Sequence, residues 1–145
     1  MPEQPPQTFA SHTRLDPPFH FFVLPVFFIT FLLSIWKLIK NLSFDSAWMV
    51  VVALAALVAV LKIRTYSLRQ QDRIIRLEER LRLAALLPES SRGKIPMLDE
   101  SQLIALRFAS DAEVPALVEK TLAGKLKGGE IKKAIVNWRP DYWRI

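Results

Sequence analysis

Two long apolar runs, separated by a ten-residue polar turn, dominate the first half of the chain. Phe19 to Trp36 and Ala47 to Leu61 contain no Asp, Glu, Lys or Arg. A bilayer core needs about 20 helical residues, with a range of about 17 to 25. The first run has 18 residues, and the second reaches 18 when Ser46, Lys62 and Ile63 are included. Because a helix satisfies its own backbone hydrogen bonds in lipid, the pattern predicts a transmembrane helical hairpin over residues 17–64, with spans at about 19–38 and 46–64.

Small and hydroxylated side chains recur on both apolar runs and predict where the two helices touch. Thr30 and Ser34 lie four residues apart on the first run, and the second run is rich in alanine. Transmembrane helices approach each other where side chains are small, and hydroxyl groups can bond across the interface. We therefore expect Thr30 and Ser34 to face the alanines, with the phenylalanines of the first run turned toward lipid or a second copy.

The second helix is predicted to continue beyond the apolar run as an amphipathic arm over residues 65–87, since no Gly or Pro occurs before Pro88. Apolar residues follow the 3, 4, 3 spacing of a helix–helix seam: Ile74, Leu77, Leu81 and Ala84, widened by Ile75 and Leu83. Three partners fit this seam: the chain's own C-terminal helices, a second copy, or an anionic lipid surface. We favour the first, on which Leu81→Asp should unfold the C-terminal region.

A linker over residues 88–96 and a small C-terminal unit over residues 97–145 follow, with three short helices predicted in that unit. Asp99 and Gln102 have the spacing of a capping box, as do Ser110 and Glu113. Pro115 delays the second helix, which ends near Gly124, and Gly128 and Gly129 precede the third. That third helix would carry Ile131, Ile135 and Trp138 on one face.

The net charge of +6 is concentrated just after the second apolar run, where residues 62–82 hold seven basic residues and three acidic ones. Flanking Lys and Arg are retained on the cytoplasmic side of a membrane. We therefore expect both termini in the cytoplasm and the hairpin in a bacterial inner (plasma) membrane. The proline-rich residues 1–16 are expected to lie extended.

Little in the sequence supports catalysis or cofactor binding, and we expect no cofactor and no enzymatic activity. Cysteine is absent, and no phosphate-binding loop, dinucleotide fingerprint or zinc-protease motif occurs. His12, Asp16 and His20 have an i, i+4, i+8 spacing that resembles a metal site. Pro17 and Pro18 interrupt a helix between the second and third of these, so no metal site is predicted.

Interaction candidates occur at two places. Arginines recur along the arm, and aromatic residues alternate with arginine near the end of the chain, as in interface hot spots or membrane anchors. These candidates are Arg69, Arg73, Arg76, Arg80, Trp138, Arg139, Tyr142 and Trp143.

Together these features favour a non-enzymatic, membrane-anchored interaction or scaffold module whose partners are the bilayer and either a second copy or another membrane protein. One alternative is a membrane-tethered nucleic-acid binder that uses Lys125, Lys127, Lys132 and Lys133, although Glu119, Glu130 and Asp141 alternate with them. The other is an accessory subunit of a membrane enzyme or transporter.

Several segments resemble an uncharacterised family of small bacterial two-span membrane proteins, carried as a domain of unknown function. They are QTFA (7–10), LDPPFH (15–20), IIRLEERLRLAALL (74–87), QLIALRFASD (102–111) and NWRPDY (137–142). The resemblance covers nearly the whole chain. It implies a bacterial inner-membrane protein and supplies no site residues.

Overall fold

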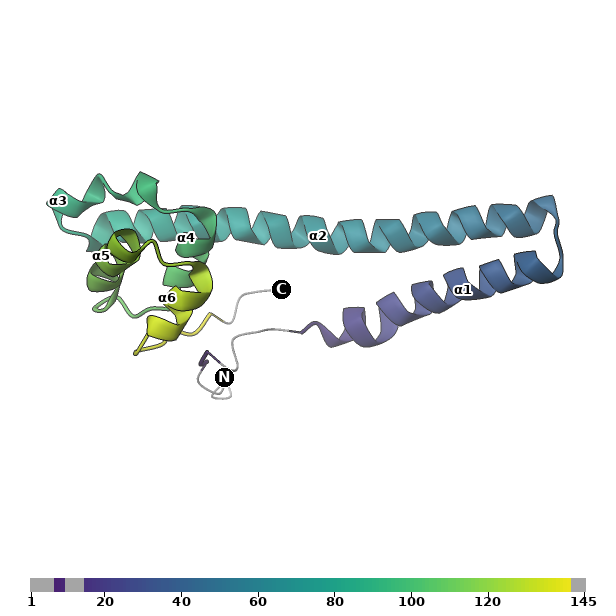
Figure 1. The fold of residues 1–145 in the computed structure, drawn as a ribbon, viewed down its shortest axis with the longest axis horizontal. Helices are drawn as coiled ribbons and strands as arrows, with labels where there is room; N and C mark the ends of the chain where they lie inside the picture. Colours follow the sequence, from purple (N-terminus) through teal and green to yellow (C-terminus); the bar gives the residue numbers. More distant parts are fainter. Residues whose placement is uncertain (1–6, 10–14, 142–145) are drawn as a thin grey trace. The chain divides into compact units, whose positions relative to one another are not determined.

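The computed structural model describes residues 7–9 and 15–141, and its regular elements are all helical. In chain order (Figure 1) they are η1 (Phe19–Val23), α1 (Leu24–Lys40), α2 (Phe44–Leu86), α3 (Glu89–Arg92), η2 (Ile95–Met97), α4 (Glu100–Leu106), α5 (Val114–Gly124) and α6 (Gly128–Ala134). Ala109 and Trp138 form an isolated antiparallel bridge, and the described ranges contain no strand. The predicted all-helical fold is therefore confirmed.

The helices belong to two compact units, and α2 contributes to both. Residues 15–69 form the hairpin unit, which holds η1, α1 and the first part of α2. Residues 70–141 and 7–9 belong to the second unit, called the helical unit here. α2 is one α-helix of 43 residues, so the helix of the second apolar run continues without a break into the residues that follow it.

Two serines form the cap that starts α2 after the turn. The Ser46 backbone N–H donates to Ser43 Oγ at 3.2 Å, and the Ser43 backbone N–H donates to Ser46 Oγ at 3.0 Å. Ser46 Oγ in turn donates to the Asn41 carbonyl at 2.6 Å. Ser43 therefore acts as the N-cap of α2, because its side chain satisfies an amide that the first turn of a helix leaves unpaired.

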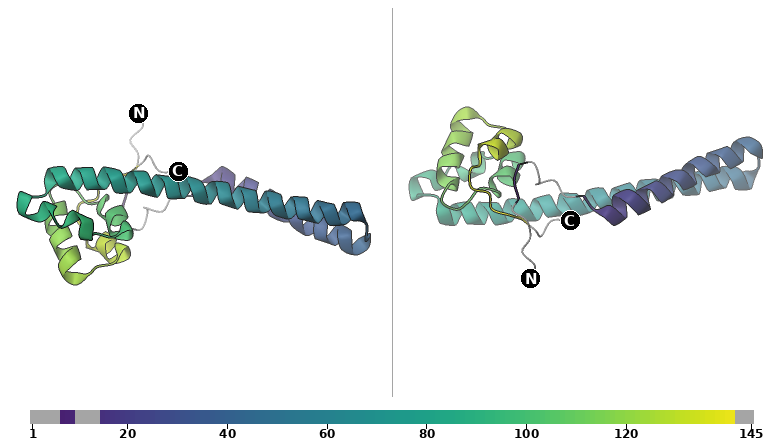
Figure 2. Two further views of the ribbon diagram at one scale, coloured as in Figure 1. Left: turned by 90° about the horizontal axis from the view of Figure 1, so that it is seen from above. Right: turned by 90° about the horizontal axis from the view of Figure 1, so that it is seen from below.

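The contact face of the hairpin differs in part from the prediction. Both views of Figure 2 show α1 beside the first part of α2, and Ser34 and Ala53 are buried as expected. Thr30 is exposed, and its hydroxyl donates to the Val26 carbonyl of its own helix. Phe27 and Phe31 are half-buried on the same face as Ser34. The expectations that Thr30 lies in the seam and that all the phenylalanines face outward were therefore wrong. The Thr30 hydroxyl bonds its own helix, as the Ser34 hydroxyl also does, so neither needs a hydrogen-bond partner across the seam.

The helical unit has one apolar core, formed by the end of α2 together with α4, α5 and α6 (Figures 1 and 2). Its fully buried side chains include Leu83, Leu103, Leu106, Phe108, Val114, Val118 and Ile131. The capping box of α4 is formed as predicted. Gln102 N–H donates to Asp99 Oδ1 at 2.8 Å, and Asp99 N–H donates to Gln102 Oε1 at 2.9 Å.

From residue 70 on, the arm is part of the helical unit and packs against the other helices of that unit, but through a different face from the one predicted. Ile75, Leu83 and Leu87 are buried, at 7%, 0% and 2% exposure, whereas Leu77 and Leu81 are 62% and 64% exposed. The four central positions of the predicted seam are therefore wrong, whereas Ile75 and Leu83, which were predicted to widen it, are buried as expected. With Leu81 exposed, Leu81→Asp is no longer expected to unfold this unit. The predicted and observed faces differ because Glu79 lies on the buried face, where it pairs with an arginine.

The starts of the two last helices also differ from the prediction. The Ser110–Glu113 capping box does not form. Instead, the Glu113 carboxylate accepts hydrogen bonds from the backbone N–H groups of Val136 and Asn137 at 2.9 and 3.1 Å. Gly128 and Gly129 are the first residues of α6 and do not precede it. A Cβ at Gly128 would lie 2.9 Å from the Ser101 carbonyl oxygen, so α4 and α6 approach closely at this glycine.

Candidate interaction site

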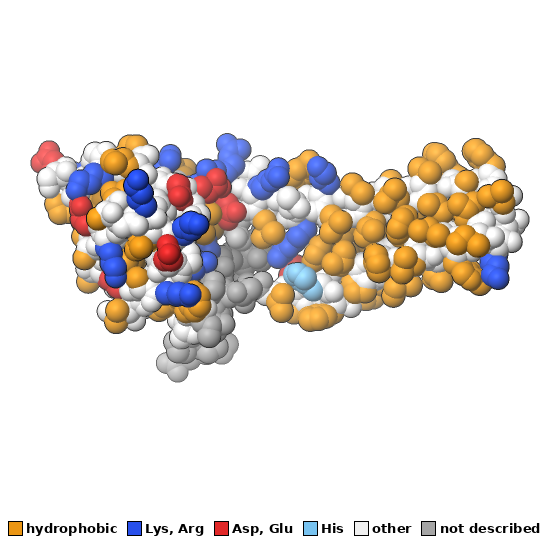
Figure 3. Space-filling view, in the orientation of Figure 1, with side chains coloured by type: hydrophobic (Ala, Val, Ile, Leu, Met, Phe, Trp, Pro, Cys, Tyr) orange, Lys and Arg blue, Asp and Glu red, His pale blue; other side chains and the backbone are white. Residues whose placement is uncertain are grey.

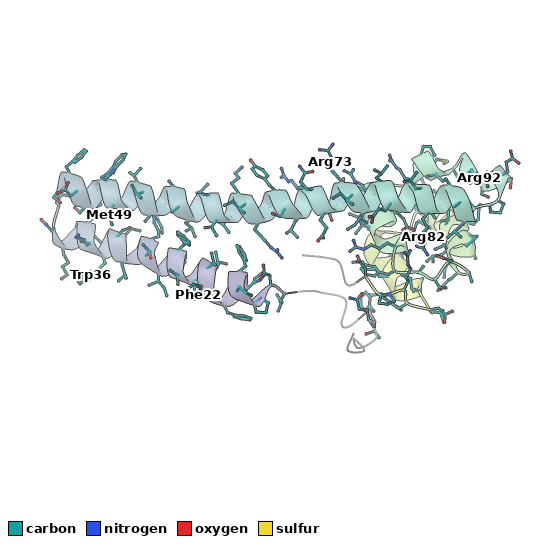
Figure 4. The ribbon with its side chains drawn as sticks, turned by 180° about the vertical axis from the view of Figure 1, so that it is seen from behind. Phe22, Trp36, Met49, Arg73, Arg82 and Arg92 are labelled. Carbon is teal, nitrogen blue, oxygen red and sulfur yellow. The ribbon has the colours of Figure 1, made fainter. Side chains whose placement is uncertain are left out.

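The main polar feature of the helical unit is a network centred on Arg82, in the last turns of α2. Its Nη1 lies 2.9 Å from Glu79 Oε1 and its Nη2 lies 2.6 Å from Asp111 Oδ1. Nη2 also donates to the Ala109 carbonyl at 2.7 Å, and Nε donates to Asp111 Oδ1 at 2.8 Å. Arg82 therefore uses its planar fork to join α2 to the segment between α4 and α5, as Figure 4 shows from the inward direction of its side chain.

The two carboxylates of this network have opposite environments. Glu79 is 3% exposed, and burial raises its pKa, although the neighbouring Arg82 acts in the opposite direction. Asp111 is exposed, and the hydrogen bond from Arg82 lowers its pKa. Burial of a carboxylate disfavours its charged form, whereas a donated hydrogen bond favours it. Burial thus destabilises the charged form of Glu79, and the ion pair with Arg82 offsets part of that cost.

A cleft of about 740 Å³ opens beside this network. Its lining contains three arginines and four carboxylates together with a few apolar side chains: Ile75, Glu78, Glu79, Arg82, Ala85, Leu86, Arg107, Asp111, Arg139, Pro140 and Asp141. Buried Arg107 pairs with Asp141 at 3.4 Å and lies over the Phe108 ring at 4.6 Å. This near balance of charge fits a polar ligand that carries both signs, such as a peptide segment, better than it fits a simple anion.

The segment that follows Trp138 closes one side of the cleft and is held by residues far away in the sequence. Asp141 N–H donates to Gln7 Oε1 at 2.9 Å, and Gln7 Nε2 donates to the Asp141 carbonyl at 3.1 Å. Arg139 N–H donates to the Phe108 carbonyl at 2.7 Å. Gln7 therefore supplies a peptide-like pair of hydrogen bonds that positions the backbone at the rim of the cleft.

The predicted interaction residues are distributed over several places and do not form one site. Arg69, Arg73 and Arg80 are exposed on α2. Figure 4 shows Arg73 on the opposite side of α2 from Arg82. Arg76 is half-buried and pairs with Glu100 of α4 at 3.3 Å, so it has a structural role in joining two helices.

Of the aromatic candidates, Trp138 packs into the helical unit. Its ring lies 5.2 Å from that of Phe108, and it is half-buried. The predicted third helix was too long, because α6 ends at Ala134 and Trp138 lies in extended backbone. Arg139 lines the cleft. Tyr142 and Trp143 lie outside the described residues.

Sequence reasoning missed Glu79, Arg82, Arg107 and Asp111. The pattern held one clue. The face of the helix that contains Ile75, Leu83 and Leu87 also contains Glu79. Arg82 lies three residues after Glu79. A charged residue inside an otherwise apolar face indicates a buried ion pair. Glu78, four residues before Arg82, obscures this signal because the two have the spacing of an ordinary surface pair.

No group of three or more metal-ligating side chains is found in the ranges that the structure covers. His12 lies outside the described residues. Asp16 pairs with Arg64 at 3.6 Å, and the His20 ring nitrogen Nδ1 lies 2.8 Å from the Asp16 carbonyl oxygen. Contrary to the expected interruption at Pro17 and Pro18, the turn from Asp16 to His20 is helical, because proline is compatible with the first positions of a helix.

The lysines suggested for nucleic-acid binding are partly engaged within the helical unit. The Lys132 and Lys133 ammonium groups lie 5.5 and 5.8 Å from the centroids of the Phe108 and Phe9 rings. Lys127 opens α6, where its backbone N–H donates to Glu130 Oε2 at 2.7 Å. Acidic Glu130 therefore lies among these lysines, as the sequence indicated.

The sequence matches a protein family over its full length. A sequence model described as a family of unknown function, DUF6526, matches residues 1–145. The chain belongs to this family. No curated protein and no solved structure matches it. The predicted membership of an uncharacterised family is thus confirmed, and the family contributes no site residues of its own.

Proposed function

We propose that this DUF6526 chain is a membrane-anchored interaction module whose hairpin unit crosses the bilayer twice and whose helical unit binds a partner through its charged cleft. One observation carries the membrane anchor. Apolar side chains cover most of the face of the hairpin unit that Figure 3 shows. Its exposed large apolar residues include Phe21, Phe22, Phe28, Leu33, Ile39, Trp48, Val51 and Leu54. A soluble protein rarely exposes so large an apolar surface.

The dimensions of the helices support the same proposal. Two helices are long and apolar enough to cross a membrane, one of them Phe19–Lys40 with 22 residues. At about 1.5 Å per residue this length is about 33 Å, against a hydrocarbon core of about 30 Å. Only 6% and 11% of the two apolar stretches are buried, whereas the core helix of a soluble protein would be mostly buried.

The ends of the hairpin support an orientation. Trp36 and Trp48, which bracket the turn, are exposed, and rings of this kind prefer the membrane interface. Basic residues are in excess after the second apolar run, at the end of the hairpin opposite the turn. Because flanking basic residues are retained in the cytoplasm, this end of the hairpin is expected on the cytoplasmic side. On this proposal both termini and the helical unit are cytoplasmic, at a bacterial inner membrane.

The cleft supports partner binding without catalysis. All three guanidinium nitrogens of Arg82 donate hydrogen bonds to Glu79, Asp111 or a backbone carbonyl, so Arg82 holds the unit together. Arg139 is exposed at the cleft, where its positive charge favours the ionised forms of Glu79 and Asp111. It forms no ion pair with a residue that the structure describes. Exposed arginine at the edge of a mixed-charge cleft is typical of a protein interface.

Membrane fractionation and reporter fusions test the anchor. The full chain should remain in the membrane pellet after alkaline carbonate extraction. A phosphatase fused to the C-terminus should be inactive, whereas one inserted at Leu42 in the turn should be active. Release by carbonate would contradict the anchor, and an active C-terminal phosphatase would contradict the orientation.

Two charge reversals test the cleft. Arg139→Glu changes the cleft, and Lys120→Glu makes the same change on an exposed position of α5. Proteins that copurify with the detergent-solubilised chain should be lost from Arg139→Glu and retained by Lys120→Glu. Equal retention by both variants would overturn the assignment of the cleft. Salt-sensitive retention on nucleic acid or an incomplete enzyme among the copurified proteins would replace it with one of the two alternative functions.

A further inference from the structure

A second apolar face of α2 points away from the core of the helical unit. We propose that residues 74–84 form a parallel two-stranded coiled coil with the same segment of a second copy of this chain. The face consists of Ile74, Leu77, Leu81 and Ala84, all exposed, and the first three are 57%, 62% and 64% exposed.

The position of this face leaves the helical unit intact when a second copy binds. With about 3.6 residues per turn, successive residues are rotated by about 100° around a helix. The centre of the exposed face therefore lies about 180° from the centre of the face that contains Ile75, Glu79 and Leu83. Packing of α2 against a second α2 consequently covers exposed apolar side chains without opening the core.

Charge complementarity identifies a second copy as the occupant. In a coiled-coil heptad with Ile74 at position a and Leu77 at position d, Arg73 is at g and Glu78 is at e. A parallel dimer brings each g residue beside the e′ residue five positions further on in its partner, and these pairs determine partner choice and orientation. Arg73 of each chain would thus meet Glu78 of the other, in two symmetric pairs.

Both of these side chains are available for that contact. Arg73 and Glu78 are exposed, and neither forms an ion pair with another residue that the structure describes. An antiparallel dimer would instead place g beside g′, where Arg73 and Arg80 repel each other. The parallel arrangement also rests on the proposed membrane function, because hairpins in one bilayer orient the two arms alike.

An anionic lipid surface fits this face less well. A helix that lies on such a surface has basic residues on both edges of its apolar face. Here Arg73 and Arg80 lie along one edge, and Glu78 lies along the other. Glu78 would be repelled by anionic headgroups, whereas it has a complementary partner in a second copy.

Single cysteines test the proposal in native membranes, since the natural chain contains none. Ile74→Cys and Ala84→Cys should each give a disulfide-linked dimer on mild oxidation, whereas Ala112→Cys, exposed on the loop before α5, should not. The two test positions lie about 15 Å apart along the helix, so an antiparallel pair cannot bring both into disulfide range. Absence of both disulfides would overturn the proposal.

A charge exchange provides the second test. Arg73→Glu and Glu78→Arg should each reduce disulfide formation at Ala84→Cys about tenfold, and the combination of both should restore it. Failure of the combination to restore the disulfide would overturn the proposed pairing. Carbonate extraction of the same membranes reports separately on the anchor, so a chain that stays in the pellet without a disulfide contradicts only the dimer.

Discussion

The buried pair of Glu79 and Arg82 provides the most direct test of how the helical unit is held together. Arg82→Met keeps most of the apolar stem and removes the charge. The side chains of this pair are 4% and 12% exposed, and removal of one partner of a buried pair costs about 3–5 kcal/mol, since the remaining charge has no compensation. We expect a loss of about 4 kcal/mol in the free energy of unfolding.

The loss of stability caused by Arg82→Met should depend strongly on Glu79, because the uncompensated Glu79 carboxylate causes most of that loss. Glu79→Gln is nearly isosteric and removes that charge. In a Glu79→Gln background, Arg82→Met still removes the donor to the buried Ala109 carbonyl, which costs about 1–2 kcal/mol. A double-mutant cycle should therefore give a coupling energy of about 2–3 kcal/mol.

Hydrogen exchange of the full chain in detergent micelles measures these changes in peptides from α4 and α5. A loss of 4 kcal/mol corresponds to an increase of about 1000-fold in exchange, at about 1.4 kcal/mol per tenfold, up to the limit of full unfolding. Arg80→Met, an exposed neighbour on α2, is the matched control and should leave exchange unchanged. An increase below tenfold for Arg82→Met, or the same increase with and without Glu79, would refute this account.

Three further predictions follow from the same unit. Burial raises the pKa of Glu79, so the folded state binds the Glu79 proton more tightly than the unfolded state does. The contribution of Glu79 to stability should therefore decline as the pH rises from about 4.3, the ordinary pKa of glutamate. Glu79→Gln should abolish that decline in hydrogen-exchange data corrected for intrinsic rates. Leu83→Ala should cost about 2–5 kcal/mol, whereas Leu81→Ala should leave the protection of α4 and α5 within about 0.5 kcal/mol; similar losses for both would contradict the observed core face. Gly128→Ala should destabilise the unit, because its Cβ would meet the Ser101 carbonyl oxygen at 2.9 Å, whereas Gly129→Ala meets nothing within 4 Å and should stabilise α6 by up to about 1 kcal/mol in thermal unfolding.

Features set by local chemistry could be predicted from the sequence. The capping box of α4 depends on Asp99 and Gln102 alone, which lie three residues apart, and it forms as expected. The start of α2 at Ser43 and the end of α5 at Gly124 are similarly local. Ser110 and Glu113 have an equally suitable spacing, but two backbone N–H groups of residues 136 and 137 compete for the Glu113 carboxylate. Hydrogen-bond donors so far away in the sequence cannot be predicted from a local pattern.

The face that α2 presents to the core could not be predicted by the same means, because α2 has two apolar faces. One contains Ile75, Leu83 and Leu87, and the other contains Leu77 and Leu81. Counting apolar residues favours the second, since Glu79 interrupts the first. The structure favours the first, because Arg82 neutralises Glu79 and also reaches Asp111 and the Ala109 carbonyl. The choice is made by tertiary partners, which periodicity does not contain.

The two faces together explain why the arm carries more apolar surface than its own unit can bury. A helix that packs against a single core needs one apolar stripe and leaves its opposite side polar. Leu77 and Leu81 lie on that opposite side, where each loses about 1.5–3 kcal/mol of burial free energy if it stays in water. The core of the helical unit is formed by other side chains, among them Leu83, Leu103 and Val118, so it does not bury Leu77 or Leu81. The exposed stripe is therefore best explained by a partner outside the unit, and Arg73 and Glu78 beside it supply the charges by which a second copy would be recognised.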